Sequence, residues 1–202
     1  MAARMLTSPA PSYGMTRTST DDDDRALIGR IASKRDANAF ERLYQSYRRR
    51  LGPFMFRFVR DAAANEEAFN DVMMTVWRKA SSYNGRSQVS TWIFGIAYRQ
   101  CLKTLRQAKR DRGGEDSHEA IADNTRSFEQ QDLVERALDG LSAEHRLVIE
   151  LSYFGGHTYQ EIAEIAECPE NTVKTRVFHA RKRLKTIMNE LGEPPSQLTR
   201  RD

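Results

Sequence analysis

The sequence predicts an all-α protein of two small helical domains that a flexible acidic linker joins. Apolar residues recur at helical spacing along most of the chain, and no alternating strand pattern is present. A chain of 202 residues with 39% apolar residues can bury one medium core or two small ones, and two small helical domains are the default interpretation. Basic residues gather in the stretches 99–112 and 174–185, and the stretch between them is largely acidic. This alternation of charge indicates two basic modules separated by an acidic connector.

The chain is expected to begin with a disordered tail over residues 1–20, which are rich in Ser, Thr, Pro and Ala and have few apolar anchors. Thr20 and the acidic residues 21–24 would then cap a helix that runs to about Ser33, because acceptors and negative charge are favourable at a helix start. A metal or interaction site is the alternative interpretation of the four acids. Consecutive residues point around a helix and do not converge, which favours the cap.

Three more helices complete the first domain, predicted over 21–112. Asp36 is expected to cap the next helix, which Gly52-Pro53 then breaks or kinks. Helices over 65–80 and 89–110 follow, separated by a turn-like run of polar residues. A loop held between two core-anchored helices is well placed for recognition.

A linker over 113–127, opened by two glycines, is expected to let the halves move independently before a second domain over 128–192 and a tail over 193–202. The helices predicted for the second domain cover 128–139, 142–154, 159–166 and 172–191.

Two of these helices form a helix-turn-helix. Thr158 and Glu161 have the spacing of a capping box, in which each side chain satisfies a backbone amide at the helix start. Pro169 ends that helix, and Asn171 is a good cap for the next one. A tight turn between two helices is the arrangement that places a second helix in the major groove of DNA.

The second of these helices presents a cationic face. Apolar residues at i, i+4, i+7 and i+11 define its buried side. The residues left outward are Thr172, Lys174, Thr175, Arg176, Phe178, His179, Arg181, Lys182 and Arg183. We expect the turns over 171–179, which start at Asn171, to meet base edges, and the three later cations to contact phosphates. A solvated basic helix in a bundle is the alternative.

Short motifs in both halves resemble one family. In the second half, 141–148 (LSAEHRLV), 161–165 (EIAEI) and 171–177 (NTVKTRV) resemble region four of extracytoplasmic-function sigma factors. In the first half, 40–44 (FERLY), 66–72 (EEAFNDV) and 91–97 (TWIFGIA) resemble region two of the same family, in the same order. The resemblance spans roughly residues 26–191. It implies that region two docks on the clamp helices of RNA polymerase core and melts the minus-ten element, whereas region four reads the minus-thirty-five element as duplex.

The resemblance also assigns residues. Polymerase contacts would be the polar face of the 65–80 helix, namely Glu66, Glu67, Asn70, Asp71 and Met74, and a solvated face is the alternative. A flipped minus-ten base would enter the loop of Tyr83, Asn84, Arg86, Ser87 and Gln88, whose amide and hydroxyl groups suit a base edge. The basic residues that would contact the DNA backbone are Arg86, Arg99, Lys103, Arg106, Lys109 and Arg110. Trp92 is equally compatible with a place in the core and with stacking on a base, whereas Trp77 is assigned to the core. Thr158 and Tyr159 are also among the residues expected to bind the minus-thirty-five element.

Arg99 and Lys103 align where many relatives have Asn and Asp, so the promoter preference does not transfer. The family implies RNA polymerase core, promoter DNA and an anti-sigma factor as partners, without membrane insertion. The two separate cysteines, the short apolar runs and the absence of a signal-peptide pattern predict a soluble cytoplasmic protein. No cofactor, metal site or catalytic activity is expected, since no phosphate-binding loop, paired cysteines or placed nucleophile occurs. A stand-alone helix-turn-helix regulator is the alternative function, and it would need a ligand pocket or a symmetric apolar seam.

Overall fold

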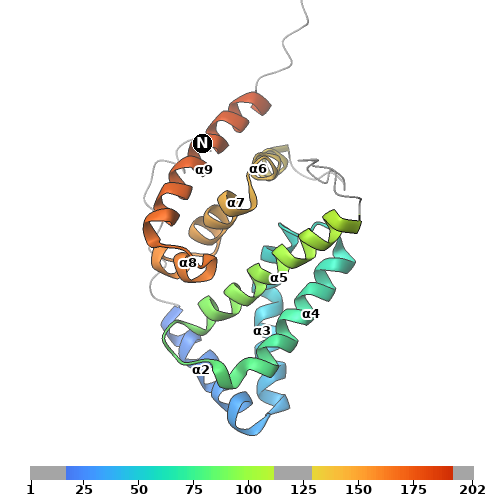
Figure 1. The fold of residues 1–202 in the computed structure, drawn as a ribbon, viewed down its shortest axis with the longest axis vertical. Helices are drawn as coiled ribbons and strands as arrows, with labels where there is room; N and C mark the ends of the chain where they lie inside the picture. Colours follow the sequence, from blue (N-terminus) through green and yellow to red (C-terminus); the bar gives the residue numbers. More distant parts are fainter. Residues whose placement is uncertain (1–16, 112–128, 193–202) are drawn as a thin grey trace, which may run out of the picture.

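The structure, a computed structural model, describes residues 17–111 and 129–192, and every regular element in these ranges is helical (Figure 1). The first half contains α2 (Arg17–Lys34), α3 (Ala37–Phe56), α4 (Ala62–Lys79), the 3₁₀ turn η1 (Ala80–Ser82) and α5 (Val89–Asp111). The second half contains α6 (Glu129–Asp139), α7 (Ala143–Ile149), the π-helical turn η2 (Glu150–Phe154), α8 (Tyr159–Ala166) and α9 (Glu170–Gly192). The predicted linker and both predicted tails lie outside the described residues, except for the first turn of α2.

The helices of the first half enclose a core of apolar side chains. Leu43 and Tyr47 from α3, Phe69 from α4 and Ile93 from α5 are fully or almost fully buried. The Asp36 side chain accepts a hydrogen bond from Ala39 N at 3.0 Å, which confirms the predicted cap of α3. Asp61 caps α4 in the same way, through Ala64 N.

One prediction for the first half is wrong, and of the break or kink expected at Gly52-Pro53 the break does not occur. Helix α2 begins at Arg17, so the acids 21–24 lie inside the helix and do not cap it. Asp21 and Asp24 instead make tertiary hydrogen bonds, the first with Val89 N and the second with Tyr47 Oη. Helix α3 does not stop at Gly52-Pro53 but continues to Phe56, where Phe54 and Met55 are buried in the core. Burial of that last turn outweighs the one backbone hydrogen bond that a proline removes.

The second half has the predicted helix-turn-helix. The Thr158 hydroxyl accepts from Glu161 N at 3.2 Å and the Glu161 carboxylate accepts from Thr158 N at 2.7 Å, which confirms the capping box of α8. Glu167 ends α8 in a left-handed conformation with φ 52°. Asn171 is not the cap of α9, because the helix begins one residue earlier and the Pro169 carbonyl accepts from the amides of the first turn.

The two halves pack against each other, with α8 lying across α5 (Figure 1). Gly95 lies at this contact, where a Cβ atom would be in ordinary van der Waals contact with the Ile165 Cα, at 3.8 Å. The Phe94 ring also meets the buried His157 ring edge-on, at 4.9 Å between centroids. The modules are therefore in contact, although the sequence suggested bundles that move independently.

Candidate nucleic-acid interface

Helix α9 presents the predicted cationic face to the surface. Val173, Val177, Ala180 and Leu184 are buried, as the spacing predicted. The predicted outward residues that are exposed are Lys174, Thr175, Phe178, His179, Lys182 and Arg183, and those half-buried are Thr172, Arg176 and Arg181. Asn171 is exposed at the first turn. Phe178, with 65% of its surface exposed, is the largest apolar group on this face. The sequence therefore identified the buried and outward sides of α9 correctly.

Arg176 differs from the cations beyond it because it lies toward the other module. Its guanidinium is 3.8 Å from Cys168 Sγ in the turn between α8 and α9. Burial raises the pKa of Tyr98 on α5 to about 12, and the Arg176 charge opposes that rise. Arg176 therefore lies at the edge between the cationic face of α9 and the α5–α8 contact.

The start of α8 is exposed at Thr158 and half-buried at Tyr159. The Thr158 hydroxyl is already engaged, since it accepts from Glu161 N and donates to the Glu161 carboxylate at 3.0 Å. Contact between Thr158 and DNA would have to use its methyl group or compete with the capping box.

The basic residues of α5 form an exposed row whose members are Arg99, Lys103, Arg106, Lys109 and Arg110. Arg99 pairs with Glu167, at the end of α8, so this cation spans the boundary between the modules. Trp92 is half-buried and its ring lies 5.4 Å from the Tyr83 ring. Trp92 is thus neither fully in the core nor free as a stacking platform.

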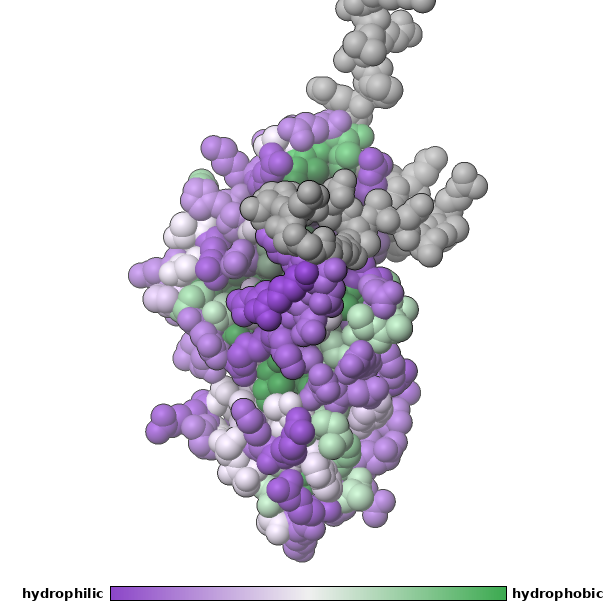
Figure 2. Space-filling view, turned by 45° about the vertical axis from the view of Figure 1, so that its right-hand side comes forward, coloured by the Kyte–Doolittle hydropathy of each residue, from purple (hydrophilic) through white to green (hydrophobic). Residues whose placement is uncertain are grey.

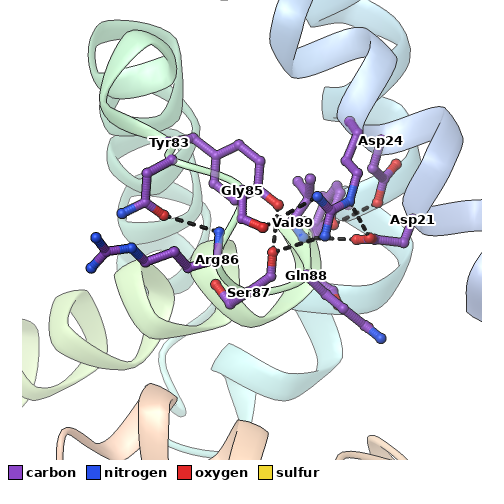
Figure 3. A network of polar contacts seen from close by, with 12 residues as sticks. Asp21, Asp24, Tyr83, Gly85, Arg86, Ser87, Gln88 and Val89 are labelled. Atoms are coloured by element: carbon purple, nitrogen blue, oxygen red, sulfur yellow. Dashed lines mark hydrogen bonds and ion pairs between the residues drawn. The ribbon is translucent and has the colours of Figure 1, made fainter.

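The loop over 83–88 is ordered by hydrogen bonds that its sequence did not reveal (Figure 3). Asn84 and Arg86 are exposed, whereas Tyr83, Ser87 and Gln88 are half-buried. The Asn84 side chain accepts from Arg86 N at 3.1 Å, and the Tyr83 hydroxyl donates to the Ser87 carbonyl at 2.5 Å. Gly85 has φ +73°, a left-handed conformation that glycine adopts without strain. Arg25 of α2 also contacts this loop, and Asp21 of α2 contacts Val89 N directly after it, although sequence reasoning did not associate α2 with the loop.

The predicted polymerase contacts lie on one exposed face of α4, since they are spaced by about one helical turn. Glu66 pairs with Arg48 at 2.7 Å, and the Asn70 side chain accepts from Tyr44 Oη at 2.9 Å. Asp71 accepts from Gln100 of α5 at 2.9 Å. Glu67 is exposed, and 47% of the Met74 surface is exposed. The face of the molecule shown in Figure 2 is mostly hydrophilic, with separate apolar patches. Met74 is one of the exposed large apolar residues of the described chain, together with Phe56, Phe154 and Phe178.

A cluster of charges joins the modules near the end of α3. Glu150, only 3% exposed, accepts from Arg57 at 3.0 Å. Asp139 accepts from both Arg60 and Arg146. Burial raises the pKa of Glu150, and the Arg57 charge acts against that rise. Sequence reasoning missed this cluster because its two sides lie 79 and 93 residues apart in the chain.

Within 17–111 and 129–192, no three His, Cys, Asp or Glu side chains are grouped so that they could hold a metal ion. None of the helices in these two ranges has the length and apolar content needed to cross a membrane.

Comparison with known proteins gives consistent matches to both halves. The family described as Sigma-70 region 2 matches residues 43–111, and the family described as Sigma-70, region 4 matches residues 131–184. The ECF RNA polymerase sigma factor RpoE of Cereibacter sphaeroides is 33% identical over 180 residues, which cover 84% of this chain and 99% of the relative. The ECF RNA polymerase sigma factor SigK of Mycobacterium ulcerans is 28% identical over 178 residues, with 83% and 95% covered.

Two solved structures resemble the fold. One is CnrH in complex with the cytosolic domain of CnrY, with a TM-score of 0.66, 20% identity, and 84% of this chain and 99% of that chain covered. The other is the sigma factor RpoE in complex with the anti-sigma factor NepR from Bartonella quintana, with a TM-score of 0.61, 26% identity, and 74% and 96% covered. The all-α fold predicted from the sequence is confirmed.

Proposed function

The chain belongs to the extracytoplasmic-function family of RNA polymerase sigma factors, and on that premise we propose how its two modules divide promoter recognition between them. As a sigma factor it directs transcription initiation, and the predicted function is confirmed at this level. Nothing favours the alternative of a stand-alone regulator. The division of labour rests on one observation above others, which is the exposed cationic face that α9 carries on a helix-turn-helix.

In this proposal the second module reads the minus-thirty-five element. The first two turns of α9 enter the major groove, and Arg181, Lys182 and Arg183 contact phosphates. Each cation that neutralises a phosphate releases counterions, which favours binding at low salt.

The first module binds RNA polymerase core and the minus-ten element. The exposed α4 face around Asp71 and Met74 docks on RNA polymerase core, and the loop over 83–88 receives an unpaired minus-ten base. The α5 cations follow the single strand. An anti-sigma factor is a further proposed partner, since the 26% identical structural neighbour RpoE was solved with one. A cytoplasmic location, where these partners would be found, is part of the proposal.

Replacing Arg176 by Ala tests the duplex contact. If the guanidinium reads a guanine through two hydrogen bonds, affinity for the minus-thirty-five element falls by about 1–3 kcal/mol and base discrimination is lost at one position. Footprinting of holoenzyme on the element and on single-base variants measures both. Lys182→Ala is the control, because loss of a phosphate contact weakens all sequences alike and reduces the salt dependence. Unchanged affinity and base preference in Arg176→Ala would exclude this contact.

Replacing Asp71 by Arg tests the polymerase contact. Charge reversal in the middle of the exposed α4 face should reduce capture of core polymerase while leaving duplex binding by the second module intact. Asp23→Arg provides the control, since it reverses another exposed acid, on α2. Core capture by Asp71→Arg equal to that of the control would place the docking surface elsewhere.

A further inference from the structure

The loop over 83–88 is held in shape from a helix that does not border it in sequence. The Arg25 guanidinium of α2 donates to the Gly85 carbonyl at 3.3 Å and to the Ser87 carbonyl at 3.1 Å (Figure 3). One planar group therefore fixes two carbonyls that lie two residues apart, a task for which its fork of donors is well suited.

Asp21 connects this clamp to the start of α5. Its carboxylate accepts from Arg25 Nε at 2.7 Å and from Val89 N, the first residue of α5, also at 2.7 Å. The first amides of a helix have no partner inside the helix. A carboxylate there stabilises the helix, because it accepts a hydrogen bond from such an amide and interacts favourably with the helix dipole. The Asp21 side chain is only 11% exposed, which protects this contact from water.

The loop itself is built to accept this clamp. The Arg25 guanidinium lies 6.0 Å from the centre of the Tyr83 ring, whose hydroxyl donates to the same Ser87 carbonyl that Arg25 binds. A Cβ atom on Gly85 would lie 3.5 Å from Arg25 Nη1, in a conformation that disfavours side chains. The carbonyls thus face α2, while the Arg86 side chain extends away from it (Figure 3).

We propose that Asp21 and Arg25 are positioning residues for minus-ten recognition, which act by holding the loop over 83–88 in the shape that receives an unpaired base. They order the loop before DNA arrives, so that the exposed Asn84 and the half-buried Gln88 meet the base without a further loss of conformational freedom. The proposal rests on the proposed function of the loop. It also gives Asp21, the first of the acids 21–24, a role in place of the predicted cap.

The test measures base discrimination by Arg25→Ala holoenzyme on single-stranded minus-ten oligonucleotides, taken from a promoter mapped through the protein's own transcription start sites. The ratio of dissociation constants between the preferred base and the other three should fall about fivefold to tenfold, as expected for loss of two ordering hydrogen bonds. Core binding and minus-thirty-five binding should not change. Arg25→Lys, which keeps the charge and part of the donor set, should restore part of the ratio.

Arg30→Ala is the matched control. Arg30 lies on the same helix, is 45% exposed against 40% for Arg25, and pairs with Asp36 instead of the loop. A melting temperature that falls equally in both variants, with discrimination lost only in Arg25→Ala, supports positioning. Equal discrimination in the two variants overturns it.

Direct loop variants separate this inference from the function on which it rests. If Asn84→Ala and Gln88→Ala leave base preference unchanged, the proposed role of the loop itself is wrong. If they abolish the preference and Arg25→Ala does not alter it, only the positioning role is wrong.

Discussion

Replacing Arg57 by Met is expected to open the contact between the two modules at neutral pH. The change removes the hydrogen-bonded partner of Glu150, a carboxylate that is only 3% exposed. Breaking one side of a buried ion pair costs about 3–5 kcal/mol, and we expect the lower end because the Arg146 charge remains close to Glu150. Separation of the modules lets water reach Glu150, so the protein should open before it unfolds. Small-angle scattering of the free protein measures the increase in radius of gyration.

The same variant should be sensitive to pH in a defined direction. Burial raises the pKa of Glu150 from its ordinary value of 4.5, and the Arg57 charge opposes this. A carboxyl with a raised pKa favours the packed state fully below its unfolded-state pKa, and this contribution is lost as pH rises through the raised pKa. Without Arg57 the pKa of Glu150 rises further. The loss of stability of the packed state in Arg57→Met should therefore be largest at neutral pH and should shrink as pH falls toward 4.5.

A second substitution supplies the control. Glu150→Gln combined with Arg57→Met removes both charges and keeps similar volumes, so packing should largely return and its pH dependence should disappear. If Arg57→Met destabilises the packed state by the same amount at neutral and acidic pH, ionisation of Glu150 is not the cause.

Features that depend on near neighbours in the chain could be predicted from sequence. Asp36 and the Thr158–Glu161 capping box act on amides three residues away, so the sequence contained all that was needed to find them. The two faces of α9 were found for the same reason, since helical periodicity alone separates buried Val173 from exposed Lys174.

Features that depend on distant contacts could not be predicted. The acids 21–24 resemble a helix cap, but Asp21 binds Val89 N, 68 residues away. The Arg25 clamp on the loop crosses 60 and 62 residues, and the Arg57–Glu150 pair crosses 93. From the sequence, each of these charged side chains could equally face solvent. Only the fold shows that it contacts a residue far away in the chain. The loop and the α9 face could thus be proposed as sites from sequence, but not the residues that hold the loop or join the modules.

Replacing Gly95 by Phe is expected to force α5 and α8 apart, whereas Gly95→Ala should be tolerated. An alanine Cβ would lie 3.6 Å from the Arg99 guanidinium and 3.8 Å from the Ile165 Cα, which are ordinary contact distances. Alanine also favours helix over glycine by up to about 1 kcal/mol. A phenyl ring would meet the backbone of α8, which cannot rotate away as a side chain can. Overpacking of this kind costs about 1–3 kcal/mol, and separation of the modules relieves it.

Opening by Gly95→Phe should also change DNA binding. Arg99 pairs with Glu167 across the same contact, and separation would release its charge for a phosphate. The Phe variant should therefore bind single-stranded DNA more tightly than the Ala variant, with a steeper dependence on salt. Scattering reports the shape and a salt titration of DNA affinity reports the released charge. If the Phe variant is as compact as the Ala variant, the α5–α8 contact adapts to the added volume. If the Ala variant opens as much as the Phe variant, the contact distance at Gly95 does not control the packing.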